Sequence, residues 1–443
     1  MSRAALVVML LHCLGCDGKG HLEARLRVAA GTHPLAGADT VSLLVAGPDG
    51  APLGASRVAA SSDGISVSSP VISGPLTLTV EASRGADVLA RGQSCASPAP
   101  AVGARLTVDV PLQLVGSFAP AAESPAAADG AALLALSEQL FLVGGTFATG
   151  AVSAQSQSYA PGAGRFTNGP SLGHPTTHAL VMPLSDGTAL VLGGGSARSL
   201  GVARYAQGEL IDAAAAFPGD WQDGAAVMLN GQVLCAGGRV ATGLSDGVWL
   251  LLGDGSAADA QAPLPSARAG LTLTAVGLDG ALAAGGLDSG GARTDLYLFE
   301  SKAFVPFGAA LSTPRHHHTA TLLTDGTVLV AGGFDGAGVP LASVERVDPV
   351  RRVVVAGGPL STARGGHAAM LLADGRVLLV GGVGAGGEPL AEAELWDPSF
   401  GGEGGGLPTG SMTSARATPS LARLCDGTIL VAGGAPTVEA YRR

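Results

Sequence analysis

The sequence is poor in charged and in aromatic side chains. Only 14% of its 443 residues are charged, against about 25% in an average protein, and 4% are aromatic. Basic residues are the minority, 25 against 35 acidic ones, which gives a net charge of −10. Because nucleic-acid binding depends on cations that neutralise phosphates, we expect no nucleic-acid partner. The hydrophobic share of 47% excludes disorder caused by high charge and low hydrophobicity.

Cysteines and long apolar runs are also scarce. Five cysteines are too few for a disulfide framework in a chain of this length. Beyond the N-terminus, no segment reaches the roughly 18 continuous apolar residues of a membrane helix. We therefore expect the body of the protein to be soluble.

Residues 1–16 have the pattern of an export signal. A short apolar run, Ala4 to Leu11, is followed by Leu14-Gly15-Cys16 and then by polar residues. This resembles a bacterial lipoprotein signal, in which a small residue precedes a cysteine that is lipidated after cleavage. His12 and Cys13 depart from that signal, and a plain signal peptide is the alternative.

Two expectations follow for the location of the protein. It is exported from a bacterial cytoplasm, and it is either a lipoprotein of the cell envelope or a secreted protein. Cys16 is the expected lipidation site, and we expect contact with a membrane only through this N-terminal lipid anchor.

Residues 17–111 contain short strand-like segments and no internal repeat. Examples are Thr40 to Val45 and Leu76 to Glu81, with turn clusters such as Gly47-Pro48-Asp49-Gly50 between such segments. Short strands separated by turn signals, without a helical period, predict a small β-sandwich domain.

Glycine is abundant, and its spacing is regular. Among 69 glycines there are seven Gly-Gly pairs that follow apolar runs, at intervals of 44 to 52 residues, and these pairs stand at 144–145, 193–194, 237–238, 285–286, 332–333, 381–382 and 433–434. Six of the pairs are preceded by an Asp-Gly or Asn-Gly hairpin turn, whose two central residues we expect at positive φ. A period of 40 to 50 residues built from strands predicts a β-propeller over residues 112–443.

Each repeat has room for four antiparallel strands. Glu345 to Pro349 is an example of the third strand, and Ala303 to Phe307 of the fourth. The first repeat has Ser137-Glu138 in place of the hairpin turn, so the choice between six and seven blades depends on accepting it, and we predict seven. Because the last repeat has room for three strands, residues 112–118 are predicted to supply the fourth and close the ring.

These repeats resemble those of kelch-repeat proteins over roughly residues 115–443. In the kelch pattern an Arg and a His precede the first strand, and the second strand ends in Gly-Gly. Residues 315–318 and 364–367 have both the Arg and the His, whereas Arg268 and Arg416 have the Arg alone. The Trp of the kelch pattern is missing. The resemblance implies an all-β fold, a seven-bladed kelch-like propeller preceded by the sandwich domain.

The candidate binding residues lie on the face opposite the hairpin turns, where the first strands begin. They are Arg268, Arg315, His316, His318, Arg364, His367 and Arg416. His316 and His318 are expected to project to one side of a strand, which is compatible with metal chelation. The favoured interpretation is that the repeated Arg and His side chains bind backbone groups of the next blade.

The same architecture occurs in galactose oxidase-like copper enzymes, whose sites need two Tyr and two His, one Tyr crosslinked to Cys. All four tyrosines fall in or beside third strands, Tyr159, Tyr205, Tyr297 and Tyr441, and no Tyr–Cys pairing suggests itself. We expect a monomeric binding protein for a protein or glycan ligand, with no catalysis, cofactor or metal. The alternative is a metal-dependent copper oxidase that uses the Arg/His face.

Overall fold

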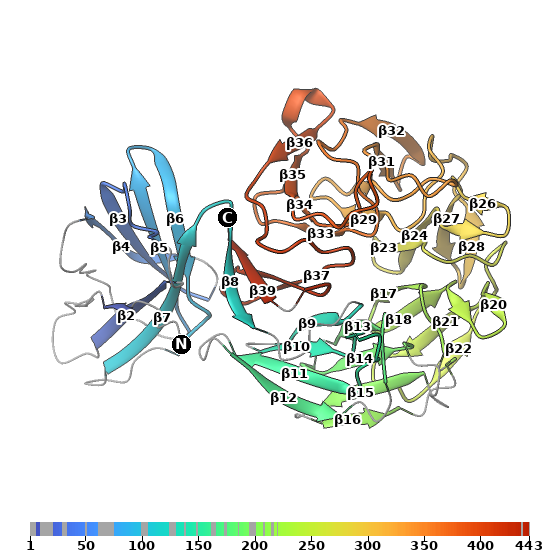
Figure 1. The fold of residues 1–443 in the computed structure, drawn as a ribbon, viewed down its shortest axis with the longest axis horizontal. Helices are drawn as coiled ribbons and strands as arrows, with labels where there is room; N and C mark the ends of the chain where they lie inside the picture. The colour runs from blue at the N-terminus through green and yellow to red at the C-terminus, as the bar shows by residue number, and fades with distance from the viewer. Residues whose placement is uncertain are drawn as a thin grey trace.

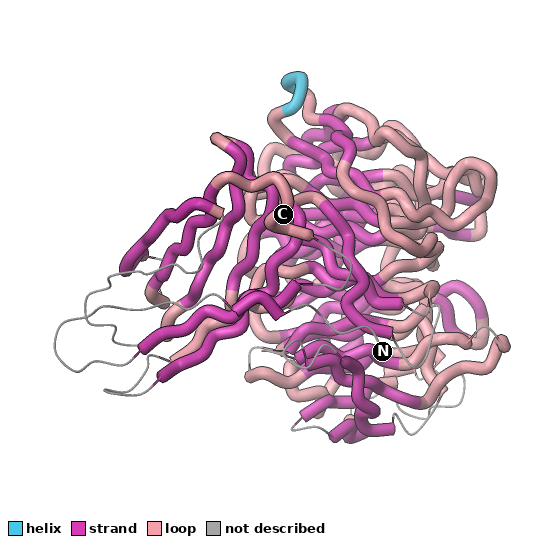
Figure 2. Tube along the Cα trace, turned by 60° about the vertical axis from the view of Figure 1, so that its left-hand side comes forward, coloured by secondary structure: helices cyan, strands magenta, loops and turns pink. Residues whose placement is uncertain are grey.

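The chain is almost entirely β-structure. The computed structural model describes residues 6–8, 21–28, 33–48, 51–60, 75–98, 105–123, 130–136, 139–147, 149–160, 165–171, 175–184, 186–194, 201–206, 209–213, 217–218, 220–435 and 437–442. In this part of the chain one short 3₁₀ helix, η1 (Phe400–Gly402), accompanies 39 strands (Figure 2). None of its helices is long and apolar enough to cross a membrane. The predicted all-β class is confirmed.

The first seven strands form one hydrogen-bonded sheet, here called the N-terminal sheet, in the order β1-β2-β7-β6-β5-β3-β4. They are β1 (Leu6–Val8), β2 (His21–Val28), β3 (Thr40–Ala46), β4 (Pro52–Ala59), β5 (Thr77–Arg84), β6 (Asp87–Gln93) and β7 (Arg105–Leu114). Alternate residues such as Val41, Leu43 and Val45 point into one core shared by five of these strands. The two separate sheets of the predicted sandwich are not found among the described residues, because these strands are joined edge to edge around a common core.

In the described part of the chain, all but four of the remaining strands form seven four-stranded antiparallel sheets, numbered here in chain order. The first three are β9 (Ala132–Leu136), β10 (Gln139–Val143), β11 (Gln155–Ala160) and β12 (Arg165–Ser171); β13 (Leu180–Pro183), β14 (Ala189–Leu192), β15 (Val202–Ala206) and β16 (Glu209–Asp212); and β17 (Ala225–Leu229), β18 (Gln232–Ala236), β21 (Val248–Leu252) and β22 (Ala258–Ala260).

The next three are β23 (Thr272–Val276), β24 (Gly280–Ala284), β27 (Leu296–Glu300) and β28 (Ala303–Pro306); β29 (Thr319–Leu322), β30 (Val328–Ala331), β31 (Val344–Asp348) and β32 (Val353–Gly357); and β33 (Ala368–Leu371), β34 (Val377–Val380), β35 (Ala393–Asp397) and β36 (Gly405–Pro408). The seventh contains β37 (Ser420–Arg423), β38 (Ile429–Ala432), β39 (Thr437–Arg442) and β8 (Ser117–Glu123). Two small hairpins, β19 (Arg239–Val240) with β20 (Gly243–Leu244) and β25 (Leu287–Asp288) with β26 (Gly291–Ala292), complete the list.

The sheets stand around a common axis, with the first strand of each innermost (Figure 1). The inner strands β9, β13, β17, β23, β29, β33 and β37 contact one another in that order, and β37 returns to contact β9. The second strand of each sheet is apolar on both faces because neighbouring sheets cover it, and Val328–Ala331 of β30 is buried throughout. This closed arrangement of stacked sheets is that of a β-propeller.

The hairpin turns differ from the prediction in their backbone conformation. Both central residues have positive φ at Asn230-Gly231, but at Asp325-Gly326 the glycine alone does. There the Asp325 carboxylate accepts hydrogen bonds from the backbone N–H and the hydroxyl of Thr327. This local side-chain bond holds the turn and makes a second positive φ unnecessary. The predicted turn of the first repeat, Ser137-Glu138, lies outside the described residues.

Ring closure occurs as predicted, but with a later segment. β8 pairs antiparallel with β39, with Ser117 opposite Arg442 and Glu123 opposite Thr437. Three of the seven predicted residues, 112–114, belong instead to β7, where Leu112 lies in the core of the N-terminal sheet. Gly116, at a φ of +69°, makes the turn between the two strands. The closing strand is therefore a direct continuation of the N-terminal sheet.

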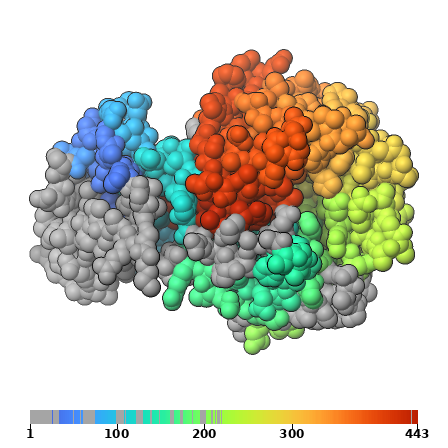
Figure 3. Space-filling model, viewed as in Figure 1, coloured from blue at the N-terminus to red at the C-terminus, as the bar shows by residue number. Residues whose placement is uncertain are grey.

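A disulfide reinforces this junction, although five cysteines did not predict one. It joins Cys95, which follows β6, to Cys425, in the turn between β37 and β38, across 330 positions of sequence. The Gln113 side-chain amide also donates to the backbone oxygen of Ala440 at 2.8 Å. In the space-filling view, the cyan residues around β7 and β8 lie against the red residues near the C-terminus (Figure 3). The N-terminal sheet thus holds the last sheet of the ring by hydrogen bonds and by a covalent bond.

We predict that the Cys425→Ser substitution lowers the melting temperature, with a loss of about 2–5 kcal/mol in the free energy of unfolding. The bond closes a long loop and so restricts the unfolded chain. Thermal unfolding should be measured with and without reductant. Reductant should destabilise the wild type and leave the variant unchanged; equal melting of the oxidised wild type and the variant would contradict a stabilising role.

Candidate functional site

Four of the predicted binding residues, the arginines, are buried inside the sheets. Arg315, Arg364 and Arg416 have no exposed surface, and Arg268 retains 2%. Each donates from Nη1 to the carbonyl oxygen of the glycine seventeen positions later, the first of the Gly-Gly pair of its own sheet. These distances are 3.1, 2.8, 2.7 and 2.7 Å for Arg268, Arg315, Arg364 and Arg416.

A buried carboxylate completes three of these arrangements. The Arg–Glu nitrogen–oxygen distances are 2.8 Å for Arg315–Glu345, 3.0 Å for Arg364–Glu394 and 3.3 Å for Arg416–Glu439. The glutamates also accept backbone N–H groups from the loop before the first strand, as Glu345 does from Ser312 at 2.7 Å. Burial lowers the pKa of Arg315, and the Glu345 charge opposes that effect. Each pair has its charge compensated inside the protein, although Nε of Arg315 and of Arg416 has no hydrogen-bond partner in the part of the chain that the structure describes.

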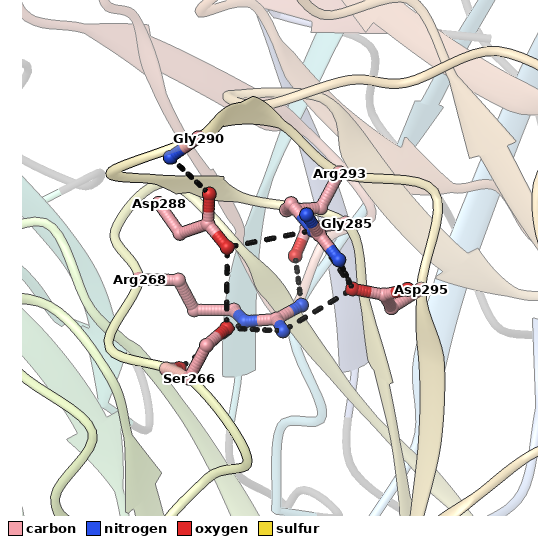
Figure 4. Close-up of polar contacts among 7 residues, drawn as sticks. All are labelled: Ser266, Arg268, Gly285, Asp288, Gly290, Arg293 and Asp295. Atoms are coloured by element: carbon pink, nitrogen blue, oxygen red, sulfur yellow. Dashed lines mark hydrogen bonds and ion pairs between the residues drawn. The ribbon is translucent and has the colours of Figure 1, made fainter.

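In the fourth sheet, different residues compensate the charge of the buried arginine, Arg268 (Figure 4). Tyr297 stands at the strand position that the glutamates occupy, and its ring centroid lies 5.2 Å from the Arg268 guanidinium carbon. The carboxylate comes from Asp295, 3.3 Å from Arg268 Nη2, and Arg293 binds the same carboxylate at 2.9 Å. Asp288 also lies in this cluster, and it accepts a hydrogen bond from Ser266 at 3.3 Å. The cluster is internally paired.

The contacts between sheets use the backbone of the arginines and the side chains of the histidines. The second glycine of a pair donates its N–H to the carbonyl of the next sheet's arginine, as Gly333 does to Arg364 at 2.9 Å. Two of the predicted binding residues, His318 and His367, are buried and bind Thr272 and Thr319 of the preceding sheet, each at 3.0 Å. The prediction that the arginine side chains bind backbone groups of the next blade is therefore wrong. They bind backbone groups of their own sheet.

Six of the seven predicted binding residues are thus closed to a ligand, and His316 is the half-buried exception. Spacing along the chain placed all seven on one face, but it could not show how deep each side chain lies. His316 and His318 do not converge on a common point either. His317 between them has a φ of +48°, which breaks the strand alternation on which that expectation rested.

The accessible polar groups lie just after the buried arginines in the sequence, or at the equivalent position of a repeat that lacks the arginine. They stand at one end of the propeller axis, here called its mouth. Fourteen or fifteen residues before the Gly-Gly pair, six successive repeats have a residue at positive φ: Gly130, His178, Asp223, Gly270, His317 and Gly366. Their backbones bridge neighbouring sheets, since His317 donates its N–H to Gly270 and Gly366 donates to His317. We call these six positions the axial ring.

Three members of the axial ring are not glycine, although glycine suits positive φ best. A left-handed conformation costs other residues roughly 1–2 kcal/mol each, and Asp tolerates it better than most. His178, Asp223 and His317 retain side chains at that cost. Strained positions of this kind concentrate at functional sites. The sequence signal for them was the repeated offset from Gly-Gly, at which three repeats have glycine and three have an ionisable residue.

Two of these side chains and a neighbour form a hydrogen-bonded chain. Asp223 Oδ1 lies 2.7 Å from His317 Nε2, and His317 Nδ1 lies 2.6 Å from His316 Nδ1. Burial works to raise the pKa of Asp223, but the bonds to His317 and Arg239 outweigh it and lower that pKa. Burial and the adjacent His317 lower the pKa of His316. Asp223 is therefore a carboxylate at neutral pH, held at the mouth of the axis.

A cavity of about 370 Å³ opens beside the hydrogen-bonded residues Asp223, His317 and His316. Its walls come from the inner ends of the seventh, first, second and third sheets, and His178 and Asp223 line it together with apolar residues that include Leu133, Leu180 and Leu421. An apolar cavity with a few polar side chains is the usual form of a small-molecule site.

The residues do not fit the copper site that the architecture of galactose oxidase-like enzymes implies. Among the described residues, no group of three or more His, Cys, Asp or Glu could hold a metal ion. The tyrosines stand on the third strands of different sheets, β11, β15, β27 and β39. Cys235 is fully buried, and burial raises the pKa of its thiol. Two Tyr and two His do not converge in the described part of the chain.

Comparison with known proteins supports the kelch-type repeat. The model of the Kelch motif matches residues 315–358, which span the fifth sheet. No curated protein matches the chain. A solved structure, "Structure of YjhT", is similar at 14% sequence identity over 63% of this chain and 97% of that chain, with a TM-score of 0.49.

The buried histidines predict a loss of stability in mild acid. Burial, aided by the Arg364 charge, lowers the pKa of His367 from 6.5 to about 3, so the folded protein keeps this side chain neutral. The unfolded chain takes up the proton below pH 6.5, so each such group costs about 1.4 kcal/mol per pH unit as the pH falls from 6.5 towards 3.

We predict that His367→Gln, which keeps a donor for Thr319, loses less stability than the wild type between pH 6.5 and 5. The exposed His33→Gln is the control and should retain the wild-type slope. Free energies of unfolding measured across this range test the difference. An unchanged slope in His367→Gln would show that His367 is protonated in the folded state as well.

Proposed function

We propose that the chain is an exported, lipid-anchored binding protein of the bacterial cell envelope, without catalysis. We take each four-stranded sheet as one blade, so that a seven-bladed propeller, expected over residues 112–443 and here begun at β8 (Ser117–Glu123), follows a separate N-terminal domain that ends with β7 at Leu114. The propeller presents its axial mouth to a protein ligand, which the low aromatic content favours over a glycan, because sugar sites commonly use stacked aromatic faces.

The disulfide between Cys95 and Cys425 supports export. Disulfides persist in oxidising compartments outside the cytoplasm and are rare inside it. The bond joins two regions that lie together in the fold, and it contributes to the ring closure described above. The proposed lipidation site, Cys16, lies outside the described residues. We propose that export through residues 1–16 brings the chain to the compartment in which this bond forms, and that cleavage of this segment removes the edge strand β1 (Leu6–Val8) from the N-terminal sheet.

The observation that carries the binding role is the cavity at the axial ring together with the strained side chains beside it. Four arginines and their acidic partners are occupied inside the sheets. His178, Asp223 and His317 stay accessible at positions where glycine would be more stable. A copper oxidase is not favoured by any contact of the described residues, so we keep the binding role alone.

We predict that the double substitution His178→Gly and His317→Gly keeps the fold and removes the capture of the partner. Glycine occupies the equivalent positions of other repeats, so the variant should melt no lower than the wild type. Asn230→Gly, at a positive φ in an exposed hairpin turn, is the matched control. Pull-down from native bacterial envelopes should recover the same partner with the wild type and the control. Equal recovery with the double variant would contradict binding at the mouth.

We also predict that labelled fatty acid is incorporated into the wild type and not into Cys16→Ser. A lipid anchor places the protein in the membrane fraction, and the variant should become soluble outside the cytoplasm. Absence of label in the wild type would overturn the lipid anchor and leave the plain signal peptide.

A further inference from the structure

The axial cavity has an apolar wall and one carboxylate at its edge. Half-buried aliphatic side chains line it, among them Leu133, Leu180, Val181 and Leu421, which come from the first, second and seventh sheets. Its volume of about 370 Å³ lies within the usual range of about 300–1,000 Å³ for ligand sites. A molecule bound there would bury an aliphatic segment and would place one polar end at the rim.

The Asp223 carboxylate is the group at that rim that can accept hydrogen bonds from a ligand. It is 27% exposed and is kept ionised by its neighbours. Each carboxylate oxygen can accept two hydrogen bonds. Oδ1 accepts one from His317 at 2.7 Å, and Oδ2 lies 3.3 Å from Nε of Arg239, whose side chain is half exposed. Acceptor positions therefore remain for a donor that enters from the cavity.

Two neighbours hold the Asp223 carboxylate through hydrogen bonds of different length. An ionised Asp223 accepts, so His317 carries its proton on Nε2. One proton then lies between His317 Nδ1 and His316 Nδ1, and burial disfavours a charge on His316. Arg239 contacts the Asp223 carboxylate through the longer of the two hydrogen bonds.

The ligand that matches an aliphatic wall and an available carboxylate is a primary ammonium on an alkyl stem. Its three N–H groups can bind Asp223 and nearby acceptors, while the methylene groups cover the leucines. The net charge of −10 also attracts cations to the protein as a whole. We propose that the axial cavity is a primary-amine site that takes the lysine side chain of a protein partner. This rests on the proposed function and names the chemistry that the mouth recognises.

The test is a titration of the full chain with n-butylammonium, in which binding is measured by two-dimensional NMR or by calorimetry. n-Butanol and butyrate, which have similar stems, serve as the neutral and anionic probes. The wild type should bind n-butylammonium saturably and more tightly than either of them. Asp223→Asn should weaken this binding at least tenfold. Because Asn also adopts positive φ readily, the variant should fold.

Asp279→Asn removes the same charge from an exposed hairpin turn and should bind as the wild type does. Tighter binding of butyrate or butanol, or equal binding by Asp223→Asn, would overturn the amine site. A second pair of probes tests the source of the amine: a lysine peptide with an acetylated N-terminus, and a lysine-free peptide with a free N-terminus. Binding of the second peptide alone would overturn the assignment to lysine.

The two proposals can fail separately. If Asp223→Asn still captures the envelope partner while the double glycine variant does not, binding at the mouth stands and the amine chemistry is wrong. If n-butylammonium binds through Asp223 but no partner is recovered from envelopes, the cavity site stands and the protein partner is wrong.

Discussion

The structure depends on backbone hydrogen bonds that the Gly-Gly pairs make with the next sheet, in four of the seven pairs with an arginine of that sheet; we call this contact the latch. The second glycine donates its N–H to that arginine's carbonyl, and the first accepts the side chain of the arginine in its own sheet. A Cβ on the first glycine would lie 2.1–2.7 Å from the carbonyl oxygen of the next sheet in six of the seven pairs. Glycine is required because the sheets approach so closely there.

This latch explains how a chain with few charges uses its buried ones. Three Arg–Glu pairs lie at repeated positions, and in the third sheet a tryptophan takes the place of arginine, with Trp221 Nε1 donating to Gly237 at 2.7 Å. The donor can change while its acceptor, a glycine carbonyl, does not. These buried donors and glycine carbonyls hold the propeller together. The ionisable side chains of the axial ring are not part of these contacts and can bind a ligand.

The spacing of the glycines made the fold predictable. Gly-Gly pairs and the turns before them mark the second strand of each repeat, and the short last repeat indicates closure by another strand. Spacing gives position along the chain but not depth, so buried Arg315 and half-buried His316 looked equally available. The disulfide joins cysteines 330 positions apart and leaves no local signal. His317 could not be assigned a role before its backbone conformation was known.

The most direct test of the latch compares Gly332→Ala with Gly326→Ala. Both glycines have positive φ, but a Cβ at Gly326 meets no atom within 4 Å, whereas one at Gly332 would lie 2.5 Å from the Arg364 oxygen. Gly326→Ala should cost about 1 kcal/mol from backbone strain alone. Gly332→Ala should cost about 1–3 kcal/mol more, because its methyl group separates two sheets. Equal losses in the measured free energies of unfolding would contradict the account.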